Sequence, residues 1–143
     1  LRNISLNIEL EEDIDIVVDA SAFSIILSNF VTNALKHSPS NSEILIKNDL
    51  EDDFLTTLSV IDHGKGIPKK YRDRVFERFF RVDKGRAKHS GGTGLGLAIS
   101  KHLARLMGYE VGMKPNKPNG SRFWISVNYA SSEEEKSLTP ELA

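Results

Sequence analysis

The 143-residue chain has no cysteine and almost no net charge, and each absence excludes a class of protein. Without cysteine there is no disulfide scaffold, no thiol catalysis and no Cys-based zinc or iron–sulfur site. A formal net charge of -1 gives no support for nucleic-acid capture by the whole surface. No run approaches the roughly 18 apolar residues of a membrane span, and no signal peptide opens the chain. We therefore expect a cytoplasmic domain of a parent protein that is either soluble or membrane-anchored.

Charge is unevenly distributed along the chain. Residues 9–19 hold six acidic residues and no basic one, whereas residues 65–88 hold ten of the 19 basic residues against three acidic ones. A charge run of this kind usually marks a solvated face. This basic run lies between two glycine clusters, where a polyphosphate would be stabilised. Both readings, solvated surface and phosphate site, stay open at this point.

Apolar periodicity predicts strands in pairs separated by single helices. Strict alternation over 4–10 predicts a strand, and the chain is expected to return in a second strand over 14–18 after an acidic turn. Helical spacing then covers 23–35, with Asp19 or Ser21 as the cap and Pro39 as the stop. The other expected elements are strands at 43–48 and 55–61, a short helical stretch through Phe76, a helix from Leu95 closed by Gly108, and strands at 109–114 and 121–127.

This order of elements predicts an α+β protein, a two-layer sandwich with one mixed sheet and the helices on one face. We expect the domain to cover residues 1–130. Residues 131–143 are acidic and polar, and we expect a disordered tail there.

Three motifs contain residues suited to nucleotide chemistry. Asn29 and Asn33 lie four apart on one helix face, with Lys36 three further on. Asparagine is a poor helix-interior residue, so these two either cap turns and face water or bind a ligand. An amide oxygen suits magnesium, which takes one or two protein oxygens together with substrate phosphates.

The second motif, Asp62-His63-Gly64-Lys65-Gly66-Ile67, follows an apolar strand. A carboxylate there can accept from an amino group, and the glycines leave room for a planar ring, although a tight turn alone is also possible. The third motif, residues 91–97, is glycine-rich and leads into a helix, where backbone N–H groups form an anion site. It is neither a dinucleotide fingerprint nor a P-loop, because the spacing and the Gly-Lys-Ser/Thr sequence are absent.

In this order the motifs resemble the ATP-binding catalytic domain of two-component sensor histidine kinases, within the GHKL superfamily. Residues 29–37 resemble the N box, 62–67 the first glycine box, 76–83 the F box and 92–97 the second glycine box. The resemblance covers residues 1–127. It implies a Bergerat-type ATP-binding fold, with ATP and Mg²⁺ as cofactors.

The resemblance also implies roles for individual residues. Asn33 is similar to the magnesium ligand, Lys36 to a residue that touches phosphate, and Arg81 to an arginine near the γ-phosphate. Asp62 resembles the carboxylate that reads the adenine amino group. The other nucleotide-binding residues that it implies are Asn29, His37, Gly64, Gly66, Ile67, Phe80, Gly92, Thr93, Gly94, Leu95, Gly96, Leu97 and Ser121. Residues 82–92 resemble the ATP lid, with Phe76, Phe79 and Phe80 as its anchors.

The residue four before the magnesium Asn separates two reactions in this superfamily. ATPases such as Hsp90 and gyrase B have a Glu there that activates water, whereas this chain has Asn29, and an amide is no general base. We therefore expect the γ-phosphoryl group to go to a histidine, with a response regulator downstream and no nucleic-acid or membrane partner. The alternatives are a GHKL-type ATPase conformational clamp and a nucleotide-sensing module without catalysis.

The four histidines of the chain do not resemble the family's phosphoacceptor, which is usually followed at once by Glu or Asp. Their positions are His37, His63, His89 and His102. We expect the acceptor histidine and the dimer contact in a separate domain upstream of Leu1.

Overall fold

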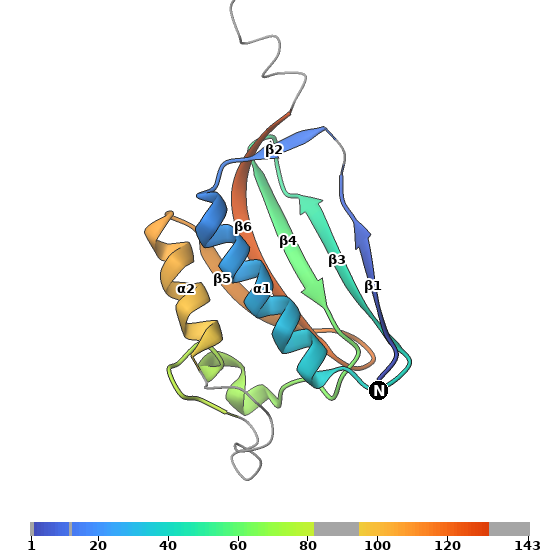
Figure 1. Ribbon diagram of the computed structural model, residues 1–143. Coiled ribbons are helices and arrows are strands. Elements are labelled where there is room, and N and C mark those ends of the chain that lie inside the picture. The colour runs from blue at the N-terminus through green and yellow to red at the C-terminus, as the bar shows by residue number, and fades with distance from the viewer. Residues whose placement is uncertain (1, 12, 82–94, 132–143) are drawn as a thin grey trace, which may run out of the picture.

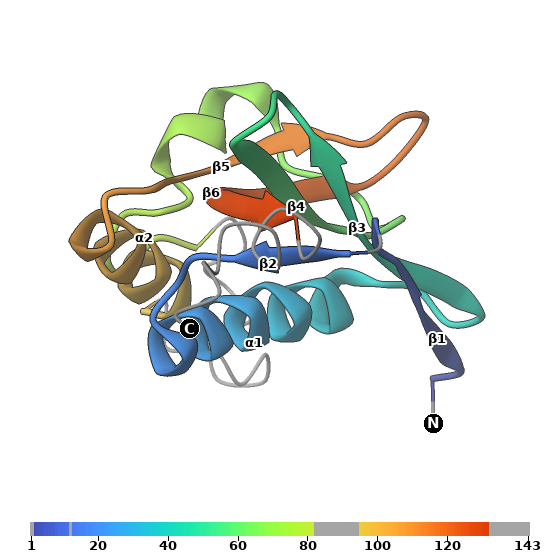
Figure 2. The same ribbon diagram turned by 90° about the horizontal axis from the view of Figure 1, so that it is seen from above.

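The computed structural model describes residues 2–11, 13–81 and 95–131. Two helices cover one face of a six-stranded sheet (Figures 1 and 2). The elements are β1 (Ile4–Glu9), β2 (Ile14–Ile16), α1 (Ala20–His37), β3 (Ser42–Leu50), β4 (Leu55–Ile61), the 3-10 helix η1 (Lys69–Arg74), α2 (Gly96–Leu106), β5 (Glu110–Pro115) and β6 (Ser121–Ser131). The expected α+β two-layer sandwich is confirmed. Within the described ranges, no helix is long and apolar enough to cross a membrane.

The sheet is mixed, with the strand order β1-β3-β4-β6-β2 and with β5 also paired to β6. β1 runs parallel to β3, and the other described pairs are antiparallel. The long β6 pairs along one edge with β4. Along its other edge it pairs first with β5 and then, near its end, with β2. β6 therefore connects β4, β5 and β2 in one sheet.

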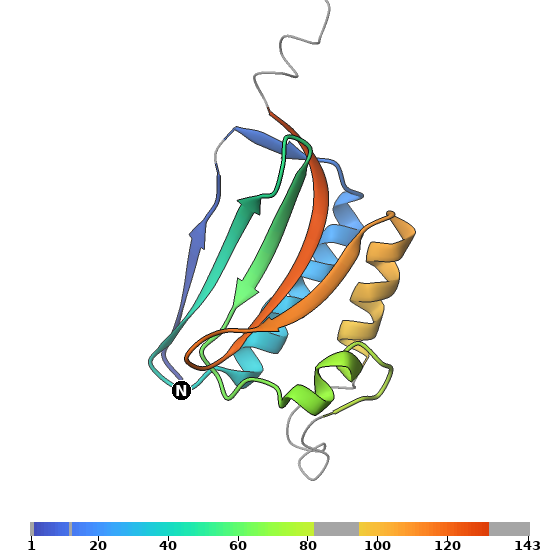
Figure 3. The same ribbon diagram turned by 180° about the vertical axis from the view of Figure 1, so that it is seen from behind.

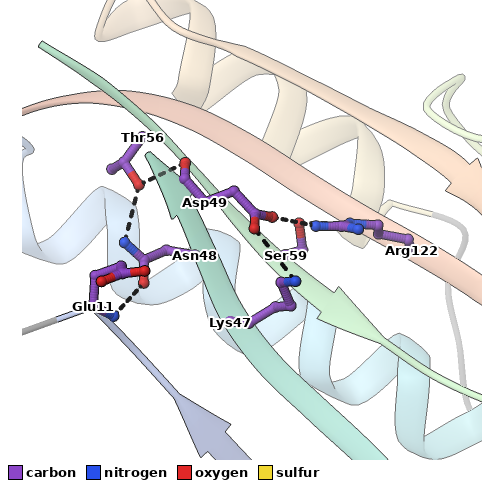
Figure 4. Close-up of polar contacts among 7 residues, drawn as sticks. All are labelled: Glu11, Lys47, Asn48, Asp49, Thr56, Ser59 and Arg122. Carbon is purple, nitrogen blue, oxygen red and sulfur yellow. Dashed lines mark hydrogen bonds and ion pairs between the residues drawn. The ribbon is translucent and has the colours of Figure 1, made fainter. Parts of the chain in front are cut away.

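The expected return of the second strand onto the first is wrong, because β1 pairs with β3 and β2 pairs with β6. The buried Asn48 directs the connection: its Oδ1 accepts from the Glu11 backbone N–H at 2.7 Å, and its Nδ2 donates to Thr56 Oγ1 at 3.0 Å (Figure 4). Asp13 then turns the chain with a left-handed φ of 60°. The connection thus crosses the end of the sheet instead of forming a hairpin.

Helix α1 begins and ends where its flanking residues predict. The Asp19 side chain accepts from the Ala22 backbone N–H at 2.8 Å, which confirms Asp19 as the cap. Ser38 is extended, as expected for a residue before proline. The buried face of α1 presents Ile26, Phe30 and Ala34 to the sheet, and the Phe30 and Phe123 rings lie 5.8 Å apart.

Two boundaries differ from the sequence-based expectation, and one is confirmed. The short helical stretch is the 3-10 helix Lys69–Arg74. Gly108 closes α2 as expected: the helix ends at Leu106, and Gly108 follows with a left-handed φ of 82°. β6 continues to Ser131, so the first residue of the expected tail belongs to the sheet, and residues 132–143 lie outside the described residues.

Neither α1 nor α2 covers the second face of the sheet (Figure 3). A polar ladder crosses it, in which Asp49 bridges Lys47 at 3.3 Å and Arg122 at 2.6 Å (Figure 4). The apolar core therefore lies on the helical side of the sheet.

Candidate functional site

Asp62, directly after β4, is a buried carboxylate with 1% of its surface exposed. Its Oδ1 accepts from the backbone N–H groups of Gly64 at 2.9 Å and Ser121 at 3.3 Å. Its Oδ2 is also buried and has no hydrogen-bond partner within the described ranges. Desolvation raises the pKa of Asp62 above its ordinary value of 3.8, against the lowering effect of these N–H groups and of His37 and His63. A buried acceptor of this kind calls for a donor from outside the described chain.

The glycines after Asp62 allow three chain segments to meet. A Cβ on Gly64 would lie 2.3 Å from the His37 carbonyl oxygen at the end of α1. Gly66 has a φ of 76°, and a Cβ on it would lie 3.0 Å from the Gly120 carbonyl oxygen. The sequence explained these glycines by room for a ring, whereas the structure requires them for close approach of the protein backbone to itself.

The turn between β5 and β6 supports Asp62 from the other side, and sequence reasoning assigned it no functional role. Asp62 N–H donates to the Ser121 carbonyl oxygen at 2.9 Å, and Asn116 Nδ2 donates to the Asp62 carbonyl oxygen at 3.2 Å. A Cβ on Gly120 would lie 1.9 Å from that same Asp62 oxygen. In the sequence, the residues from Pro115 to Gly120 indicate a turn but not its contact with Asp62.

The end of α1 brings Asn33, Lys36 and His37 next to this loop. Asn33 is half-buried, and Lys36 lies one turn further on. Desolvation lowers the pKa of Lys36, and the positive charge of Arg81 lowers it further. Desolvation and the Lys36 charge lower the pKa of His37, so its ring is neutral at neutral pH.

Asn29 connects the two helices. Its Nδ2 donates to the Gly96 carbonyl oxygen at 2.9 Å and to Ser100 Oγ at 3.1 Å. The Ser100 hydroxyl donates to the same Gly96 oxygen at 2.9 Å. Both Nδ2 protons are therefore used within the protein.

The second glycine box is described only in part. Leu95 is the N-terminal flanking residue of α2, Gly96 begins the helix, and Leu97 packs against the core, as does Ile67. A Cβ on Gly96 would lie 3.5 Å from the Asn29 side chain, an ordinary contact. Gly92, Thr93 and Gly94 lie outside the described residues, as does the expected lid from residue 82 onward.

The aromatic residues of the F box differ in their environments. The Phe76 ring lies 6.0 Å from that of Phe123, and the Phe80 ring lies 5.6 Å from that of Tyr71. Phe79 has a left-handed φ of 62° and is 69% exposed. Phe76 and Phe80 thus pack on the body of the domain and Phe79 does not, while the lid that the three rings were expected to hold lies outside the described residues.

Curated proteins are similar to this chain over most of its length. The chain is 36% identical over 126 residues to the sensor histidine kinase WalK of Bacillus subtilis (strain 168), a match that covers 87% of this chain and 21% of WalK. It is 41% identical over 101 residues to the sensor-like histidine kinase SenX3 of Mycolicibacterium smegmatis, covering 71% of this chain and 26% of SenX3. The chain thus matches about a fifth to a quarter of the length of these relatives.

Solved structures and a family description agree with these relatives. The mycobacterial sensor histidine kinase MprB superposes with a TM-score of 0.78 at 27% identity, over 90% of this chain and 83% of that one. Full-length ShkA, solved in complex with AMPPNP, superposes with a TM-score of 0.75 at 30% identity, over 90% of this chain and 26% of ShkA. Because residues 18–131 match its description, the chain belongs to the family of histidine kinase-, DNA gyrase B- and HSP90-like ATPases, among relatives that are sensor histidine kinases.

Proposed function

We propose that this domain binds Mg-ATP and donates the γ-phosphoryl group to a histidine on a separate dimerisation domain. The observation that carries the proposal is the buried Oδ2 of Asp62, which has no partner in the described part of the chain. The exocyclic amino group of adenine is a donor of the required kind, whereas guanine presents a carbonyl oxygen that an ionised carboxylate repels. The complex of the related ShkA with AMPPNP, an ATP analogue, supports the same ligand class.

The base would lie against the loop after β4. Asp62 accepts from its amino group, while Gly64, Gly66 and Ile67 line the base. The Ser121 backbone holds the other oxygen of Asp62, which leaves Oδ2 as the acceptor for the base. His37 lies against this loop through its backbone, because a Cβ on Gly64 would be 2.3 Å from the His37 carbonyl oxygen.

The phosphates would extend from this loop toward Lys36, Arg81 and the start of α2. The charge of Arg81 lowers the pKa of Lys36, so both side chains would contribute positive charge to the same phosphate site. The first backbone N–H groups of α2, from Leu95 to Leu97, add an anion-binding helix N-terminus. In the proposed complex Phe80 holds Arg81 near this position by packing on Tyr71.

Asn33 is the residue that would hold Mg²⁺. It is half-buried on the helix that presents Lys36, and its amide oxygen is a neutral, hard ligand. When bound, magnesium neutralises charge on the phosphates of the nucleotide. In the proposed complex Asn33 lies on the face of α1 that is next to the phosphates, and Lys36 and Arg81 bind them directly.

Transfer to histidine is favoured over hydrolysis by the state of Asn29. Both of its Nδ2 protons are donated to Gly96 and Ser100, and its amide cannot take a proton from water. The same geometry opposes the conformational-clamp alternative, which needs a general base at this position. The acceptor histidine and the dimer contact would lie in other parts of a longer cytoplasmic or membrane-anchored kinase, as the greater length of WalK and SenX3 suggests. A separate response regulator would then receive the phosphoryl group.

Two measurements test this function. Calorimetry of the 143-residue chain should give tight binding of Mg-ATP and much weaker binding of Mg-GTP. Labelled ATP mixed with the chain and purified dimerisation domains should label those domains on a histidine. Equal affinities for the two nucleotides, or release of phosphate at several turnovers per minute without an acceptor, would contradict the proposal.

A further inference from the structure

We propose that Asn116, in the turn between β5 and β6, is a positioning residue that sets the base specificity of the nucleotide site. It acts through Asp62, so this inference rests on the function proposed above. Figures 1 and 3 place the β5–β6 turn beside the loop that follows β4. The two segments are 54 residues apart in sequence at their shared hydrogen bond.

The Asn116 side chain holds together the backbone around Asp62. Its Nδ2 donates to the Asp62 carbonyl oxygen at 3.2 Å and to the Asn119 carbonyl oxygen at 3.3 Å. It also lies 3.3 Å from His63 Nδ1, which accepts when the ring proton is on Nε2. The Asn116 backbone N–H donates to the Gly120 carbonyl oxygen at 3.0 Å, which closes the turn. One side chain thus links the turn to the residue proposed to read the base.

The turn fits Asp62 closely enough to transmit a displacement. Gly120 lies so near that a Cβ on it would be 1.9 Å from the Asp62 carbonyl oxygen. Ser121 N–H donates to Asp62 Oδ1 at 3.3 Å, and Asp62 N–H donates to the Ser121 carbonyl oxygen at 2.9 Å. If the turn moves away, the donor to Oδ1 moves with it, and the carboxylate can rotate. Hydrogen bonds weaken steeply with angle, so Oδ2 would then meet the adenine amino group poorly.

Asn116 is a positioning residue and not a base contact, because its Nδ2 has only two protons and protein acceptors surround it. Its removal should therefore affect the nucleotide that uses Asp62 and spare the one that does not. A merely structural role would lower stability without changing the ratio of affinities for ATP and GTP. That ratio is the decisive readout.

The experiment compares Asn116→Ala with Asn119→Ala in the 143-residue chain. Asn119 is exposed in the same turn, and its side chain makes no hydrogen bond within the described residues. Circular dichroism first sets a temperature at which each variant is folded, and calorimetry then gives the dissociation constants for Mg-ATP and Mg-GTP. Asn116→Ala should weaken ATP binding about three- to tenfold, on the magnitude of one hydrogen bond, while GTP binding should not weaken. Asn119→Ala should match the wild type.

A double-mutant cycle separates action through Asp62 from direct contact with the base. In an Asp62→Ala background, Asn116→Ala should have no further effect on ATP affinity. Asn116→Asp keeps the shape of the side chain but replaces the donor with an oxygen that faces the Asp62 carbonyl. It should therefore weaken ATP binding at least as much as Asn116→Ala does. This variant also keeps the test decisive if the alanine variant does not fold.

Two results would overturn the inference: an unchanged ATP-to-GTP ratio in Asn116→Ala or Asn116→Asp, or full additivity with Asp62→Ala. Failure of the proposed function looks different, because the wild-type chain itself would then bind ATP and GTP equally.

Discussion

The side-chain amide of Asn29 donates to the backbone carbonyl oxygen of Gly96 at 2.9 Å, which ties the middle of α1 to the first turn of α2. The second proton of the same nitrogen goes to Ser100 Oγ at 3.1 Å. Asn29 stands where the ATPase relatives have a catalytic Glu. It therefore also links α1, which holds the proposed magnesium ligand, to α2, which holds the proposed phosphate site. Its substitution tests the reaction and the fold together.

Asn29→Glu should not create an ATPase. It removes both donors and places a carboxylate against the Gly96 carbonyl oxygen, which should cost about 1–3 kcal/mol of stability. In a domain of this size the thermal midpoint should fall by roughly 3–10 °C. Calorimetry and phosphate release measure both effects, with Thr32→Glu on the exposed face of α1 as the matched control. Rapid hydrolysis by a variant as stable as the wild type would contradict the role of Asn29 as a link between the two helices.

Asp62 should make the stability of the nucleotide-free chain depend on pH. Because its folded pKa is raised above 3.8, its contribution is fully present below 3.8 and is lost as pH rises through the raised value. Asp62→Asn cannot titrate, so its stability relative to the wild type should increase over that window and level off above it. Denaturant unfolding at a series of pH values gives the two curves, and parallel curves would show that Asp62 ionises as freely as in the unfolded chain.

Asn33→Ala should impair phosphoryl transfer more than nucleotide affinity, because a magnesium ligand stabilises charge that develops during transfer. The transfer rate to an acceptor domain and the magnesium dependence of nucleotide affinity are the two readouts. The magnesium dependence of nucleotide affinity should flatten in the variant. Thr32→Ala, one residue away on the exposed face, controls for changes in the helix. A wild-type transfer rate together with unchanged magnesium dependence would exclude Asn33 as the ligand.

Local patterns predicted most of the elements, because each depends on neighbouring residues. Asp19 caps α1, Pro39 stops it, and the strand over 55–61 matches β4. Strand pairing was not predictable in the same way. Alternation over 4–10 says which face of β1 is apolar but not that β3 is its partner, and the deciding contact runs from Glu11 to Asn48, 37 residues away.

The candidate site shows the same division between local and distant information. The resemblance selects Asp62 and Asn29, but the contacts that define their environments come from Asn116 and Ser100, 54 and 71 residues away. Phe79 shows a different limit: its neighbours in the F box pack on other rings, whereas Phe79 has a left-handed φ of 62° and is 69% exposed. Backbone conformation at a single non-glycine residue leaves no pattern in the sequence.

Gly64 and Gly96 should separate folding from nucleotide binding. Gly64→Ala should destabilise the chain strongly, since its Cβ would lie 2.3 Å from the His37 backbone oxygen and backbone cannot move aside easily. Gly96→Ala meets nothing closer than 3.5 Å and adds a better helix former, so stability should be unchanged or slightly higher. If phosphate approaches the start of α2, the added methyl should still weaken Mg-ATP binding about tenfold or more, on the scale of an overpacked contact.

Thermal unfolding and calorimetry on the two variants separate these effects. A Gly96→Ala chain that is stable and binds ATP as the wild type does would place the phosphates away from the α2 N-terminus. The proposed path of the nucleotide from Asp62 past Lys36 to α2 would then have to be redrawn toward Arg81, the other cation near Lys36.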